Sequence, residues 1–145
     1  MRSTKKLTVV LDTNVLLVSI SSRSKYHWLY DALLKGKYQI AFTHEILLEY
    51  EEVIGKRWNV NIAINVIRSV TELPNAVLIP VYYQMKLISA DVDDNKFVDC
   101  AFAANADCIV THDHHFDILN TIPFPRIPLV DIHQFKNMLK DDKVI

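Results

Sequence analysis

Short runs of apolar, often β-branched residues alternate in this chain with longer stretches in which apolar positions recur every three or four residues. The short runs are typical of buried strands, and the longer stretches are typical of amphipathic helices. The predicted strands are residues 7–11, 38–42, 76–81, 108–111 and 128–132. The predicted helices are residues 15–20, 26–35, 45–58, 59–73, 91–105, 116–119 and 135–139. Because strands and helices alternate, the pattern predicts an α/β fold with a central, mainly parallel sheet, built as one domain over residues 1–145.

The first predicted strand ends abruptly at an acid, Asp12. An aspartate in this position lies at the edge where open α/β sheets bind ligands, beyond the carboxyl ends of the strands. Asp113 repeats the arrangement, because it follows the strand 108–111 with only His112 between them. We therefore expect both carboxylates at the same edge of the sheet.

Helical geometry ranks the acids in the predicted helix 91–105. With Asp94 set at zero, Phe97 falls at about 300°, Val98 at about 40° and Ala101 at about 340° around the helix axis. Asp94 is thus centred on the apolar face, which predicts that its side chain points toward the sheet. Asp99 falls at about 140° and is predicted to face solvent. A different reading of Asp94, as no more than a helix cap, stays open.

The same geometry selects Glu49 from an acidic helix. With Ile46 at zero, Tyr50 falls at about 40° and Glu49 at about 300°, at the margin of the apolar face. Glu45, at about 260°, is its nearest rival. Glu49 can also be read as an acid on a solvated helix face, and the sequence leaves that alternative open.

A cluster of four carboxylates needs a counter-cation. Two unit charges about 4 Å apart repel by roughly 4 kcal/mol at an effective dielectric near 20. Several such pairs would strain a domain whose stability is about 5–15 kcal/mol. Ligands that are all oxygen favour Mg²⁺ or Mn²⁺, and these ions can assist phosphodiester hydrolysis.

Composition limits the other classes of function. The 145 residues carry a net charge of −1, so any nucleic-acid contact needs a local basic patch. The isolated glycines exclude Gly-rich nucleotide loops, and the two cysteines fit neither a zinc motif nor a disulfide framework, which indicates buried apolar roles. We expect no signal peptide and no membrane association, and hence a cytoplasmic protein. The candidate phosphate contacts are Arg23, Lys25, Lys56, Arg57 and Lys96, although each is better read as plain surface charge.

Four stretches together resemble the PIN domain family: Leu11–Leu16, Glu49 within its helix, Asp93–Phe97 and Ile109–Asp113. Within that family the sequence is most similar to the VapC-like toxins of VapBC-type toxin–antitoxin systems. The resemblance implies a three-layer α/β/α fold and an endoribonuclease that depends on Mg²⁺ or Mn²⁺. It also implies an antitoxin protein as partner, and a homodimer.

The resemblance also implies roles for individual residues. The metal-binding and catalytic acids would be Asp12, Glu49, Asp94 and Asp113. Asn14 would support Asp12 or a water near the metal, and the Thr111 hydroxyl would support one of the acids. Thr13 is a weaker candidate for such support.

Three alternatives remain beside this reading. His112, His114 and His115 are not part of the family motif, and they are best read as ordinary loop residues, although they could contact phosphate or bind zinc or nickel. The whole chain could be a non-catalytic PIN-fold module for RNA binding or assembly. A phosphatase-like hydrolase with Asp12 as nucleophile is disfavoured, because position 14 is asparagine where that motif has a second acid.

Overall fold

The computed structural model describes residues 6–80, 95–112, 116–117 and 127–143. No helix in these ranges is long and apolar enough to cross a membrane. The strands are β1 (Thr8–Leu11), β2 (Gln39–Phe42), β3 (Ala76–Leu78), β4 (Cys108–Val110) and β5 (Leu129–Val130). The helices are α1 (Thr13–Ile20), α2 (His27–Leu34), α3 (His44–Arg57), α4 (Val60–Thr71), α5 (Asn95–Ala104) and α6 (Ile132–Lys143).

The strands form one parallel sheet in the order β3-β2-β1-β4-β5, which confirms the predicted sheet. The first strand is central, and the chain moves outward from it in one direction through β2 and β3 and in the other through β4 and β5. The strand order therefore reverses between β1 and β4. Ligands of open α/β sheets bind in the crevice at such a point.

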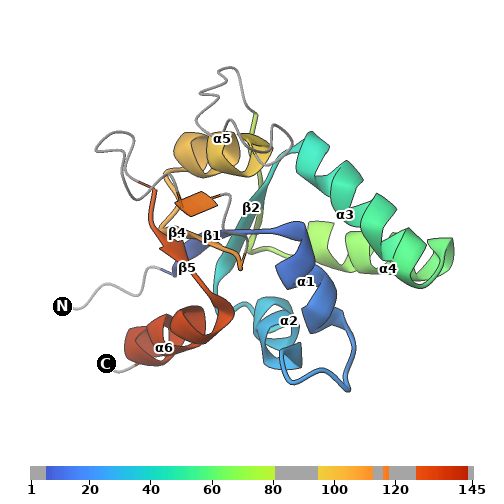
Figure 1. The fold of residues 1–145 in the computed structure, drawn as a ribbon, viewed down its shortest axis with the longest axis horizontal. Helices are drawn as coiled ribbons and strands as arrows, with labels where there is room; N and C mark the ends of the chain where they lie inside the picture. The colour runs from blue at the N-terminus through green and yellow to red at the C-terminus, as the bar shows by residue number, and fades with distance from the viewer. Residues whose placement is uncertain (1–5, 81–94, 113–115, 118–126, 144–145) are drawn as a thin grey trace.

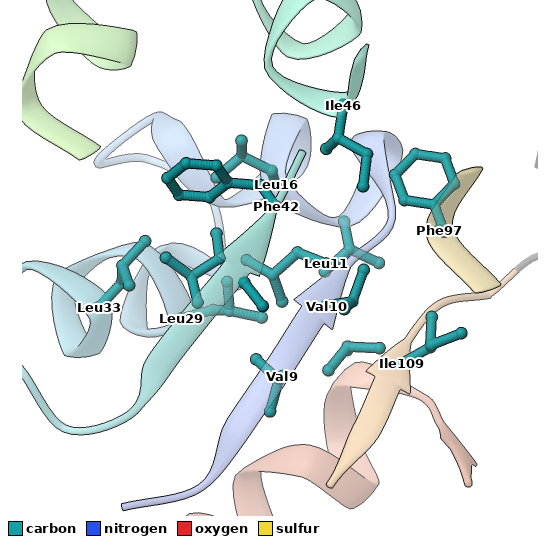
Figure 2. Close-up of a cluster of buried hydrophobic side chains, with 14 of the residues drawn as sticks. Val9, Val10, Leu11, Leu16, Leu29, Leu33, Phe42, Ile46, Phe97 and Ile109 are labelled. Carbon is teal, nitrogen blue, oxygen red and sulfur yellow. The ribbon is translucent and has the colours of Figure 1, made fainter. Parts of the chain in front are cut away.

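Helices cover both faces of the sheet, as a parallel sheet requires. In Figure 1, α5 lies on one face, while α2 and α6 lie on the other. Figure 2 shows the core that results, with Val9, Val10 and Leu11 of β1 surrounded by side chains from several helices. These three residues are fully buried, because both faces of the central strand are covered. The fold is the predicted three-layer α/β/α arrangement.

The predicted stop of the second helix at Gly36 is confirmed. Gly36 adopts a φ of 75°, a conformation that a residue with a Cβ adopts only with strain. Its backbone nitrogen donates to the Leu33 carbonyl at 3.0 Å, and the Lys37 nitrogen donates to the Ala32 carbonyl at 2.9 Å. This pair of bonds is the Schellman motif that closes many helices.

The C-terminal prediction was wrong in its boundaries. The helix expected at 135–139 spans Ile132–Lys143, and the strand expected at 128–132 spans only Leu129–Val130. The cause is a capping box: the Gln134 nitrogen donates to Asp131 Oδ1 at 2.7 Å, and the Asp131 nitrogen donates to Gln134 Oε1 at 2.8 Å. These two bonds start the helix directly after Asp131.

Smaller differences concern the other element ends. The first helix begins at Thr13, earlier than predicted, and β3 ends at Leu78. Phe116 and Asp117 form a short helical turn where a helix at 116–119 was expected. The rest of that segment, and residues 91–94 of the predicted fifth helix, lie outside the described residues.

Candidate active site

Asp12 lies directly after β1, at the point where the strand order reverses. Its backbone nitrogen donates to the Val110 carbonyl of β4 at 3.0 Å, which extends the pairing of the two strands beyond β1. Its side chain makes no capping bond to α1. Instead the Thr111 hydroxyl, which follows β4, donates to Asp12 Oδ2 at 2.8 Å. Asp12 is 6% exposed and Thr111 is 7% exposed, so this bond is shielded from water and fixes the orientation of the carboxylate.

The start of α1 favours a negative charge at Asp12. The Asp12 carbonyl accepts bonds from the backbone nitrogens of Val15 and Leu16, so the helix begins at this residue. The free N–H groups and the dipole of a helix N-terminus stabilise a nearby anion. The strand end and the helix start thus place one carboxylate where an anion is favoured.

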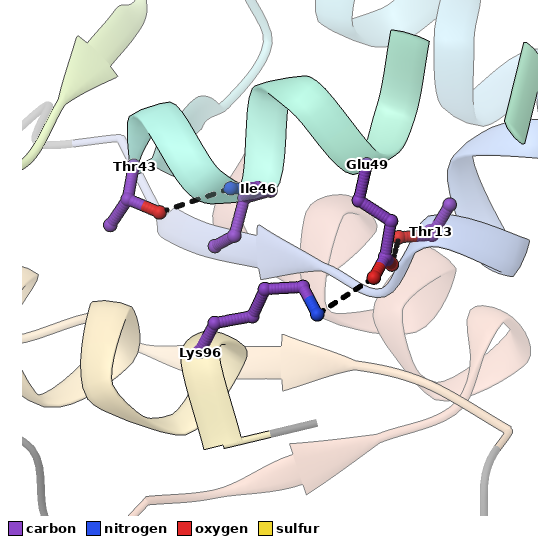
Figure 3. A network of polar contacts seen from close by, with 5 residues as sticks. All are labelled: Thr13, Thr43, Ile46, Glu49 and Lys96. Carbon is purple, nitrogen blue, oxygen red and sulfur yellow. Dashed lines mark hydrogen bonds and ion pairs between the residues drawn. The ribbon is translucent and has the colours of Figure 1, made fainter. Parts of the chain in front are cut away.

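Glu49 is held at both of its carboxylate oxygens, as Figure 3 shows. The Thr13 hydroxyl of α1 donates to Oε2, and the Lys96 ammonium of α5 lies 2.7 Å from Oε1. Three helices therefore converge on one carboxylate. The Glu49 side chain is 29% exposed, so it remains open to solvent ions, whereas the Lys96 side chain is only 8% exposed. Because Thr13 adjoins Asp12 in the chain, its bond brings Glu49 to the end of β1.

The helix that carries Glu49 is fastened to the sheet at the next residue. The Tyr50 hydroxyl donates to the Leu11 carbonyl of β1 at 2.6 Å, and the tyrosine is fully buried. Burial, and then the charges of Cys100 and Asp12, raise the pKa of Tyr50 well above its usual value, so it stays a donor. At its start α3 is capped by Thr43, whose hydroxyl accepts from the Ile46 nitrogen at 3.1 Å. The position of Glu49 is therefore set by buried contacts.

The other predicted site residues are either exposed or outside the described part of the chain. Asn14 is exposed, and no hydrogen bond joins its side chain to another described residue. Asp94 and Asp113 lie outside the described residues, as do His114 and His115. His112 is exposed, and its ring centroid lies 6.5 Å from that of Tyr26.

Asp99 corrects the helical-angle argument. It was expected to face solvent, but it is only 6% exposed and lines a cavity of about 260 Å³ together with Lys96 and Glu45. Helix α5 packs against β1, β2, β4 and α3, so it is enclosed on more than one side. An angular projection finds the most apolar face of a helix, but it does not show how many faces the fold covers.

The role expected for Lys96 also changes. It was a candidate phosphate contact, yet its ammonium is turned inward to Glu49. Of the other basic candidates, Arg23 and Lys25 are exposed, and Lys56 pairs with Glu52 at 2.9 Å on the surface of α3. The local sequence pattern does not show that Lys96 differs from the exposed basic residues, because the carboxylate that binds Lys96 comes from another helix.

The donor chemistry of the site fits a hard divalent cation. Asp12 and Glu49 supply carboxylate oxygens, and the hydroxyl oxygens of Thr111 and Thr13 lie against them. The Lys96 ammonium also contacts Glu49 and is the one positively charged group among these contacts. Oxygen ligands are those that Mg²⁺ and Mn²⁺ prefer. Within the described ranges no three acidic, histidine or cysteine side chains are grouped closely enough to hold a metal ion. A complete metal site here thus needs ligands beyond these two carboxylates.

Comparison with known proteins decides the family. A sequence model of the PIN domain matches residues 8–115. The chain belongs to the PIN domain family. This PIN domain shares its fold with a chain from the crystal structure of VapBC2 from Rickettsia felis bound to a DNA fragment from their promoter. The TM-score is 0.60 at 18% identity, over 86% of this chain and 98% of the other. A comparison with curated proteins finds no match.

The match covers the elements that build the candidate site. It begins at the first residue of β1 and extends past Thr111, so the Asp12 and Glu49 carboxylates both fall within the PIN domain. The C-terminal strand and helix, β5 and α6, lie beyond the matched residues. As a PIN domain, the chain is a member of a family of nucleases.

Proposed function

We propose that this PIN domain is an endoribonuclease that depends on Mg²⁺ or Mn²⁺ and hydrolyses RNA phosphodiester bonds. The observation that carries the proposal is the convergence of Asp12 and Glu49 at the end of the central strand. Asp12 is buried and oriented by Thr111, and Glu49 is bonded to the residue that adjoins Asp12. Acids that converge at the binding edge of an α/β sheet, one of them buried, are typical of a functional site.

The proposed metal ligands are Asp12, Glu49, Asp94 and Asp113. When bound, a divalent ion supplies the positive charge that activates a water molecule and stabilises the leaving oxygen. The hydroxyl of Thr111 orients the Asp12 carboxylate that would hold the cation. Thr13 and Lys96 restrict Glu49 to one orientation in the same way. Asn14, exposed beside Asp12, is proposed to support Asp12 or a water near the metal.

The decisive experiment is a cleavage assay on RNA with Mn²⁺, comparing the wild type with Asp12→Asn. The substitution removes one charge but keeps the size of the side chain and an oxygen that can accept from Thr111, so the fold is expected to be unchanged. Cleavage by the wild type should stop in excess EDTA and should be abolished in the variant. Asp31→Asn is the matched control, because Asp31 of α2 has a side chain that is 46% exposed and pairs with Lys35. Its activity should equal that of the wild type.

Two outcomes would separate the proposal from its alternative. Full activity of Asp12→Asn, or full activity in EDTA, contradicts the proposed metal-dependent mechanism. A folded wild type that binds RNA but neither binds Mn²⁺ nor cleaves would instead support a non-catalytic RNA-binding or assembly module. Circular dichroism of each variant shows whether a loss of activity comes from the site or from unfolding.

We further propose that the protein is the toxin of a toxin–antitoxin pair and forms a homodimer. Support for the toxin assignment comes from the fold shared with a chain of the VapBC2 structure. A small DNA-binding protein encoded beside this gene, and a stable complex when the two are produced together, are the expected findings. Light scattering of the purified protein measures its oligomeric state directly.

A further inference from the structure

Lys96 is a cation built into the candidate active site. Its Nζ atom lies 2.7 Å from Glu49 Oε1, and its side chain is 8% exposed. It also lies 5.3 Å from the centroid of the buried Phe97 ring. By contrast, Lys56 on the surface of α3 has a side chain that is 76% exposed. The Lys96 side chain is therefore shielded from solvent, whereas that of Lys56 is largely exposed.

Shielding the Lys96 ammonium from solvent costs free energy, which other contacts must offset. Removing an ammonium from water is unfavourable, and ordering the long lysine side chain loses rotamer entropy. The compensation is local negative charge, because Glu49 contacts Lys96 directly, while Asp12 and Asp99 are both buried carboxylates of the same region. The ammonium thus offsets part of the repulsion that a cluster of acids creates.

We propose that Lys96 is the internal counter-cation of this site: it positions Glu49 and limits the affinity for the divalent ion. The inference rests on the proposed function, since the ion is the one that the nuclease would use. Without the ion, Lys96 stabilises Glu49 at the required place. With the ion present, the same positive charge repels it, so the ion is held less tightly than the carboxylates alone would hold it. The site then stays organised without its metal.

Coulomb's law gives the size of the expected effect. A unit charge about 6 Å from a divalent ion changes its affinity roughly tenfold, even at the dielectric of water. Replacing Lys96 by a neutral side chain of similar length should therefore tighten Mn²⁺ binding about tenfold. A salt bridge that only fastened α5 to α3 would lower stability but would leave the dissociation constant for Mn²⁺ unchanged.

The experiment is calorimetric titration of metal-free protein with MnCl₂, without any nucleic acid. Lys96→Met and Lys96→Gln both remove the charge, and Lys96→Arg retains it. Lys56→Met is the matched control, since it breaks an ion pair of the same kind on an exposed surface of α3. We expect Kd to fall about tenfold in Lys96→Met and Lys96→Gln, and to match the wild type in Lys96→Arg and Lys56→Met.

Melting temperatures with and without Mn²⁺ give a second readout. The neutral variants should melt lower than the wild type in EDTA, and they should gain more than the wild type when Mn²⁺ is added. An unchanged or weaker Mn²⁺ affinity in both neutral variants overturns the inference and leaves the proposed nuclease intact. If the folded wild type shows no saturable Mn²⁺ binding, the proposed function and this inference both fail.

Discussion

Substitution of Glu49 by alanine tests how much the contacts of Glu49 contribute to the stability of the fold. The change leaves the Lys96 ammonium, with its side chain 8% exposed, without the Glu49 carboxylate. Removing one partner of a buried ion pair costs about 3–5 kcal/mol, because a charge stays away from water. Glu49 itself is 29% exposed, so water reaches part of the gap and the cost falls to about 3 kcal/mol at the lower end of that range. The Thr13 hydroxyl, 5% exposed, also loses its acceptor, which adds about 1 kcal/mol.

The resulting loss of about 3–4 kcal/mol is large for a chain of this size. In domains of about 150 residues each kcal/mol shifts the melting temperature by about 2–4 °C, so Glu49→Ala should melt roughly 10 °C lower. Urea unfolding followed by the fluorescence of the two tryptophans measures the free energy of unfolding. EDTA must be present, because a bound metal ion would add stability of its own. Glu51→Ala, an exposed acid on the same helix, is the matched control and should change little.

The double variant Glu49→Ala with Lys96→Met separates charge from packing. Removing both partners leaves no charge away from water, so the double variant should recover about 1–2 kcal/mol relative to Glu49→Ala alone. The reasoning is refuted if Glu49→Ala is as stable as Glu51→Ala. It is equally refuted if the double variant is less stable than the single one, because that result would show that Lys96 is not left as an uncompensated buried charge when Glu49 is removed.

Two further predictions concern a hydroxyl and the thiols. Thr111→Val removes the donor to Asp12 at nearly constant volume, so RNA cleavage should fall about 10–100-fold with an unchanged circular dichroism spectrum; Thr71→Val, at an exposed position on α4, should keep full activity. Burial raises the pKa of the Cys100 and Cys108 thiols to about 12, from an ordinary value of 9.0. The thiols therefore ionise first in the unfolded chain, so their stabilising contribution is complete below pH 9.0 and is lost between pH 9.0 and about 12. Urea midpoints at pH 8 and pH 10.5 measure this loss of stability. The thiol explanation is contradicted if the midpoint falls by the same amount between these two pH values in the variant with both cysteines replaced by alanine.

Local pattern accounts for much of the fold. Apolar β-branched runs predicted the strands, and Gly36 predicted the end of α2, because each signal acts within a few residues. The C-terminal helix was predicted too short, although its cause is also local. Asp131 and Gln134 form a capping box whose spacing is visible in the sequence, but residues 128–132 were read as a strand and the cap was missed.

Local patterns also identified some residues of the candidate site and misplaced others. Position at the end of a buried strand identified Asp12, and helical periodicity favoured Glu49 over Glu45. The structure places Asp12 and Glu49 beside the reversal in strand order, whereas Glu45 is exposed. Periodicity failed for Asp99, because it records the angle of a side chain around its own helix and not the elements that cover it.

The sequence by itself determined that this is a PIN domain, and it identified Asp12 as the acid at the end of the central strand. Only the tertiary structure showed that Thr111 orients Asp12 and that Lys96 and Thr13 hold Glu49. The reason is that strand and helix signals arise from neighbouring residues, whereas these contacts join elements that are distant in the chain. Whether a lysine faces water or a carboxylate depends on which helix the fold packs against it.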